Sequence, residues 1–145
     1  ICLSFSFGSF ICIGRALLYS FPLFDRSDLA LGEWIMKNTR KDAVFLSSTW
    51  HSNVAMSIGG RLLTMGYGGW VWTHGLNLDS RFELIQKLAS NVENVSLFDQ
   101  YNIQYVIKRI DDQEFGFYFP DLNQSLNWLL LYDSPIVKLY RVAHT

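Results

Sequence analysis

The sequence predicts a small α/β fold: a Rossmann-like parallel sheet in two or three layers, with an antiparallel pair of strands at one edge. Short apolar runs bounded by polar residues alternate with segments whose apolar residues recur at helical spacing. This rhythm is typical of parallel strands joined by crossover helices. Towards the end, two strand-like segments surround Asp133-Ser134-Pro135 and predict the antiparallel pair. The 145 residues suffice for one ordinary core, so we expect one water-exposed domain.

Individual elements follow from the same patterns. Strands are predicted where β-branched, aliphatic and aromatic residues form short runs, at residues 43–48, 61–66, 103–109, 127–132 and 136–142. The first of these runs is continuously apolar, as in a strand buried on both faces. Helices are predicted at residues 27–37, 52–58, 80–88 and 96–102. We expect Ser27 or Asp28 to cap the first helix, and loops at 67–79 and 111–124.

The first fourteen residues carry no charge, and Arg15 follows them. We interpret this segment as the end of a transmembrane helix, whose beginning lies upstream because a full span needs about 20 apolar residues. A signal peptide would begin with a basic region, and a buried core helix would be apolar on one stripe only. Residues 1–24 are therefore predicted to be the helix end and an interfacial segment, and residues 25–145 an extracytoplasmic α/β domain.

Composition excludes several classes of function. The formal net charge of −1 provides no field that would attract nucleic acid. Both cysteines, Cys2 and Cys12, lie in the apolar segment, which leaves no disulfide framework or thiolate metal site for the domain. His51 and His74 lack the helical spacing of a metal-binding pair, so we predict neither a metal nor a cofactor.

The most distinctive stretch is rich in glycine and aromatic residues, and it follows the second predicted strand. Its glycines allow tight turns, Trp70 and Trp72 offer flat faces, and His74 offers a hydrogen-bonding ring nitrogen. A loop beyond the carboxyl end of a strand is where α/β sheets bind ligands, and this one is suited to stack a sugar. Alternatively, the tryptophans pack on the domain or lie in a membrane interface.

Further candidate contacts come from neighbouring segments. Tyr67 belongs to the same loop, while His51 and Asn53 follow the first predicted strand and are expected to reach the same crevice. Arg81 and Arg61 flank the loop, where a guanidinium suits a phosphate or carboxylate or forms a structural ion pair with Asp79 or Glu83. No phosphate-binding loop or nucleophile elbow is present, so no catalytic residue is predicted.

The order and spacing of these motifs resemble the C-terminal region of multi-spanning membrane glycosyltransferases of the GT-C type, which include polyprenyl-phosphate-dependent mannosyltransferases. The resemblance covers the chain to about Arg109 and is most specific in the Trp-His-Gly loop. It is carried by Gly14-Arg15, Ala30-Leu31-Gly32-Glu33-Trp34-Ile35, Asn38-Thr39, Asp42-Ala43-Val44-Phe45-Leu46, Gly60-Arg61, Met65-Gly66-Tyr67, Gly69-Trp70-Val71-Trp72-Thr73-His74-Gly75, Arg81 and Tyr105-Val106-Ile107.

The resemblance implies a parent enzyme that moves a sugar from a lipid-phosphate donor on the extracytoplasmic side of a membrane. This chain would be its accessory domain, with membrane lipid, the rest of the parent and the lipid-linked sugar as partners. The catalytic acidic residue of that class is expected near the first membrane helices, outside this chain. The alternatives are a non-catalytic sensor or interaction domain of a membrane protein, and an independent soluble α/β enzyme.

Overall fold

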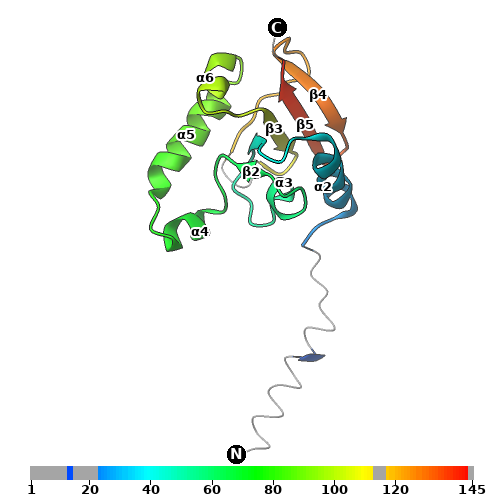
Figure 1. Cartoon of the computed structure of the whole chain (residues 1–145), viewed down its shortest axis with the longest axis vertical. Coiled ribbons are helices and arrows are strands. Elements are labelled where there is room, and N and C mark those ends of the chain that lie inside the picture. The colour runs from blue at the N-terminus through cyan, green and yellow to red at the C-terminus, as the bar shows by residue number, and fades with distance from the viewer. Residues whose placement is uncertain (1–12, 15–22, 113–116, 144–145) are drawn as a thin grey trace, which may run out of the picture.

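A five-stranded mixed sheet forms the centre of the protein (Figure 1). The computed structural model describes residues 13–14, 23–112 and 117–143. Across the sheet, the strand order is β2 (Leu62–Leu63), β1 (Val44–Leu46), β3 (Tyr105–Arg109), β5 (Val137–Val142) and β4 (Trp128–Asp133). The pairs β1–β2 and β1–β3 are parallel, whereas β3–β5 and β4–β5 are antiparallel. The predicted α/β fold with an antiparallel pair at one edge is confirmed.

Helices cover both faces of the sheet, which gives three layers (Figure 1). Side chains alternate along β1, so Phe45 belongs to the apolar cluster beneath α2 (Arg26–Asn38) and α3 (Val54–Ser57). Leu46 belongs to the opposite cluster, beneath α5 (Leu78–Ser90) and α6 (Val95–Gln100). A strand in the middle of a three-layer structure must bury both faces, which explains its continuously apolar sequence.

The cap of the first helix lies earlier in the chain than the predicted caps, Ser27 and Asp28. Asp25 caps α2 by accepting from the Asp28 amide at 2.7 Å, and the Asp28 carboxylate accepts from the Asp25 amide in return. This reciprocal capping box satisfies two amides that the helix leaves free. The prediction of Ser27 or Asp28 as the cap was therefore wrong, because Asp28 occupies the third helical position. Asp28 also pairs with Arg109 at the end of β3.

The C-terminal end of α2 is held by a buried cation. Arg61, 8% exposed, donates to the carbonyls of Met36 and Thr39 at 2.9 Å and to that of Gly59 at 2.8 Å. Its Nε also donates to Thr39 Oγ1 at 2.9 Å. The last carbonyls of a helix lack intrahelical donors and carry negative partial charge, so a guanidinium satisfies both needs. Among the described residues Arg61 has no carboxylate partner, so the expected ion pair with Asp79 or Glu83 does not form.

The stretch predicted as a loop at 67–79 contains a short helix, α4 (Gly68–Thr73). It has no capping side chain at its N-terminus, and its C-cap His74 is followed by Gly75, whose φ of +70° favours glycine. Two of its residues are glycine and none is a strong helix former, so helix propensity does not predict this helix. The other predicted helices and strands are present, with bounds that differ by a few residues at their ends.

The predicted end of a transmembrane helix falls mainly on residues 1–12 and 15–22, outside those that the structure describes. Within the described ranges, no helix combines the length and apolar character needed to span a bilayer. The boundary between residues 24 and 25 therefore stays a prediction.

Replacing Gly32 by alanine should destabilise the fold. A Cβ on Gly32 would lie 2.4 Å from Ile58 Cγ2 and 3.1 Å from Val54 Cγ2, because α2 and α3 meet there. Such overpacking costs about 1–3 kcal/mol, although alanine is intrinsically the better helix former. The free energy of unfolding, measured by urea denaturation of the full chain, should fall by this amount. Gly66→Ala is the control, since a Cβ there meets no atom within 4 Å; equal losses for both would contradict the packing argument.

Replacing Arg61 by methionine should lower the free energy of unfolding more than Gly32→Ala does. The apolar side chain leaves the carbonyls of Met36, Thr39 and Gly59 without their donor. We expect the free energy of unfolding to fall by about 3 kcal/mol, the upper end of the cost of an unmet buried acceptor. The control, Arg141→Met, removes an exposed guanidinium from β5. It should change the free energy of unfolding by less than about 0.5 kcal/mol. A comparable effect of the two substitutions would show that the capping bonds contribute little.

Candidate functional site

The loops that follow β1 and β2 meet at one edge of the sheet. These strands are parallel neighbours, with Val44 opposite Leu62, so both chains leave the sheet in the same direction. His51 follows β1 and its ring lies 5.2 Å from that of Tyr67 and 5.0 Å from that of Trp70, both of which follow β2. The Tyr67 and Trp70 rings are 5.9 Å apart and nearly perpendicular. Three of the predicted site residues therefore form one aromatic cluster.

Glycine makes room for this cluster. A Cβ on Gly69 would lie 2.6 Å from Cε1 of the Tyr67 ring, so this ring packs on the bare backbone of α4. A Cβ on Gly68 would lie 3.3 Å from Leu78 Cδ1 and 3.7 Å from the Phe82 ring. Both glycines therefore leave room for neighbouring side chains of the protein.

The surface of α4 is apolar and exposed. The exposed fractions are 71% for Trp72, 56% for Leu76 and 41% for both Trp70 and Tyr67, and no residue of α4 is buried. We call these four residues the aromatic patch. Flat, amphipathic rings in such positions suit contact with a sugar, a lipid headgroup region or another protein.

His74 and Arg81 add polar groups near this surface. His74 Nδ1 donates to the Trp70 carbonyl at 2.7 Å, which leaves Nε2 of this exposed side chain available for a hydrogen bond to another molecule. Arg81 lies in the first turns of α5 and borders a hollow of about 210 Å³ at the carboxyl end of β2. The other residues that line the hollow are apolar or uncharged: Leu63, Thr64, Met65, Gly66, Val71 and Leu76. A ligand with one anionic group and an apolar portion would match this lining.

Asn53 lies inside the fold. It is 6% exposed, accepts from the Ala55 amide at 3.1 Å and donates to Ser47 Oγ at 2.6 Å. These bonds cap α3 and fix the turn after β1, as asparagine does at helix starts. Its side chain thus shapes the loop that carries His51.

A buried carboxylate near the same sheet edge escaped the sequence analysis. Asp112 follows β3, is 3% exposed and accepts from the Arg109 amide at 2.7 Å through Oδ2. Its Oδ1 has no hydrogen-bond partner in the described part of the chain. Burial raises the pKa of the Asp112 carboxyl, and the nearby Ser48 side chain and Arg109 amide only partly oppose this. The available sequence signal was an acidic residue close behind a strand, at a point where the parallel part of the sheet ends.

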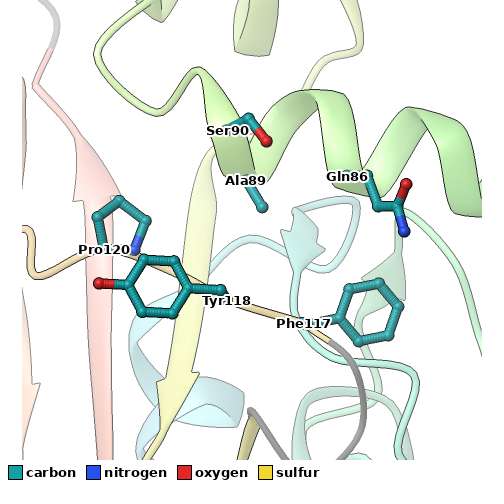
Figure 2. A pocket seen from close by; sticks show the side chains of 6 residues that line it. All are labelled: Gln86, Ala89, Ser90, Phe117, Tyr118 and Pro120. Carbon is teal, nitrogen blue, oxygen red and sulfur yellow. The ribbon is translucent and has the colours of Figure 1, made fainter.

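A second hollow, of about 430 Å³, is lined by other residues than the aromatic patch. Figure 2 shows Gln86, Ala89 and Ser90 of α5 on one side of it, and Phe117, Tyr118 and Pro120 of the segment before β4 on the other. None of the residues predicted for the site lines this hollow.

The sequence matches no family model and no curated protein. Among solved structures, the fold is similar to that of the C-terminal globular domain of an oligosaccharyltransferase from Archaeoglobus fulgidus. The TM-score is 0.56, the sequence identity is 12%, and the match covers 83% of this chain and 99% of that domain. At this identity the likeness establishes a shared fold, and nearly the whole of the other domain takes part in it.

Replacing Asp112 by asparagine should remove a pH-dependent part of the folding free energy. Because burial raises its pKa, the folded state binds this proton more tightly than the unfolded chain does. Relative to Asp112→Asn, the wild type should therefore lose stability as pH rises from about 3.9, the ordinary aspartate value, through the raised pKa. Urea midpoints of both proteins across this range provide the measurement. A stability difference that stays constant with pH would contradict the assignment.

Proposed function

We propose that this chain is the C-terminal accessory domain of an integral-membrane glycosyltransferase that uses a lipid-phosphate-linked sugar donor. The observation that carries the proposal is its fold, which it shares with a C-terminal globular domain of an oligosaccharyltransferase. The order of its sequence motifs, which resembles that of GT-C enzymes, independently points to the same class. In this proposal residues 1–24 end a transmembrane helix and residues 25–145 form a domain on the extracytoplasmic side.

The chemistry of the sheet edge supports a role in binding the donor or acceptor. Sugars stack on flat aromatic faces and need neutral hydrogen-bonding groups, and Trp72 and the Nε2 of His74 provide both on one exposed surface. Arg81, beside an otherwise uncharged hollow, supplies a positive charge for a phosphate. The proposed contact residues are therefore Tyr67, Trp70, Trp72, His74, Arg81 and His51.

Asn53 acts indirectly in this scheme. Since its amide is buried against Ser47 and the start of α3, it positions the loop that carries His51. The proposal assigns no catalytic residue to this chain, and the reacting acid would come from the membrane part of the parent enzyme.

The alternative is a non-catalytic interaction domain, which the large exposed fractions of Trp72 and Leu76 favour. An interaction surface would use the aromatic patch alone, whereas a sugar site needs the histidines and Arg81 as well. Sugar transfer by the parent protein is therefore the discriminating property.

Trp72→Ala should slow sugar transfer by the membrane protein that contains this chain. The side chain is 71% exposed, so its removal should leave the fold intact. We expect about a tenfold fall in the transfer rate from a polyprenyl-phosphate sugar, corresponding to roughly 1.4 kcal/mol of lost transition-state binding. Labelled-sugar transfer in isolated membranes provides the measurement.

The matched control is Tyr118→Ala, which removes a 66% exposed aromatic side chain from the second hollow. This variant should transfer sugar at the wild-type rate. The proposal is refuted if wild-type membranes transfer no sugar from lipid-phosphate donors, or if the two variants lose activity equally.

A further inference from the structure

The segment between Arg61 and Asp79 contains no charged residue, yet much of it lies at the surface. In a domain surrounded only by water, charged side chains would normally interrupt such a stretch, because exposed aromatic and aliphatic groups cost free energy there. Trp72 and Leu76, each more than half exposed, are the extreme cases. Something other than bulk water is therefore expected to contact the aromatic patch.

The types of side chain in the patch narrow the choice of partner. Three of its four residues, Tyr67, Trp70 and Trp72, combine a wide apolar ring with one polar hydrogen-bonding group. Such residues concentrate where a hydrocarbon layer meets water, since the ring enters the apolar layer and the polar group stays hydrated. His51 and His74 beside them are likewise amphipathic. The patch thus has the composition of a membrane-interface surface.

The position of the patch favours the same partner. In Figure 1, α4 lies at the lower end of the domain, where the chain also enters α2, while α6 and the end of the last strand lie towards the opposite end. Leu23 is itself 61% exposed. In the sequence it is preceded by the uncharged residues 1–14, which we predict to end a membrane span. A bilayer reached by that segment would face the end of the domain that carries α4.

We propose that α4 and the aromatic patch lie in the interfacial layer of a lipid bilayer, with the indole rings of Trp70 and Trp72 at headgroup depth. This contact would orient the domain by two points of attachment, the preceding chain and the patch. It goes beyond the proposed function and does not require it, because docking on lipid needs no sugar. Where both hold, the docking would bring His74 and Arg81 to the depth of a lipid phosphate.

Tryptophan fluorescence of the full chain in lipid vesicles tests this placement. The five tryptophans all lie at or beyond Trp34, so residues 1–24 add no indole signal. The chain is reconstituted in vesicles of phosphatidylcholine and, in parallel, in vesicles of phosphatidylcholine with brominated acyl chains, which quench indoles that approach the hydrocarbon. The wild type should be quenched, and the double variant Trp70→Phe, Trp72→Phe should lose most of that quenching.

The matched control is Trp34→Phe. Trp34 lies on α2, half-buried, with its ring 6.5 Å from that of Tyr132, so its replacement should leave the quenching unchanged. Unquenched wild-type protein, or a double variant quenched as strongly as the wild type, would overturn the proposal and favour a protein partner on the patch. The vesicles contain no sugar donor, so failure of the transfer assay and failure of this experiment are independent results.

Discussion

The buried guanidinium of Arg61 is the interaction on which the arrangement of the candidate site depends. It joins the last carbonyls of α2 to the Gly59-Gly60 turn at the start of β2. Its described acceptors are neutral oxygens, so the cation is satisfied by helix-end carbonyls rather than by an acid. Because β2 has only two paired residues, this anchor at its start acts together with the bonds from Thr64 to the Phe45 carbonyl at its end, after which the chain continues towards α4.

The parallel pairing of β1 and β2 then determines which side chains meet. Both strands end at the same edge, so His51 contacts Tyr67 and Trp70 although more than a dozen residues separate them in the chain. Beneath them, Asn53, Ser47 and Asp112 form the buried polar part of this edge. The edge thus combines an internal hydrogen-bonded layer, which fixes the loops, with an external aromatic layer available to a partner.

The two layers have different physical consequences. Inside, burial raises the pKa of the Asp112 carboxyl, so ionising this group as pH rises costs folding free energy. Outside, the exposed indole of Trp72 contributes little to the core and is free to contact another molecule. The fold is similar to that of the C-terminal globular domain of an oligosaccharyltransferase, and a fold alone does not specify an activity.

The sequence by itself determined the elements whose signals are local: the apolar run at β1, the helical stripe of α5 and the two strands around Asp133-Ser134-Pro135. These depend on periodicity and turn chemistry, which neighbouring residues carry. It also singled out the aromatic loop. Only the tertiary structure decided that Asn53 turns inward while His51 turns outward, that Arg61 caps α2, and that Asp112 is buried. Each of these outcomes depends on which distant backbone group or side chain lies opposite, and local sequence does not carry that information.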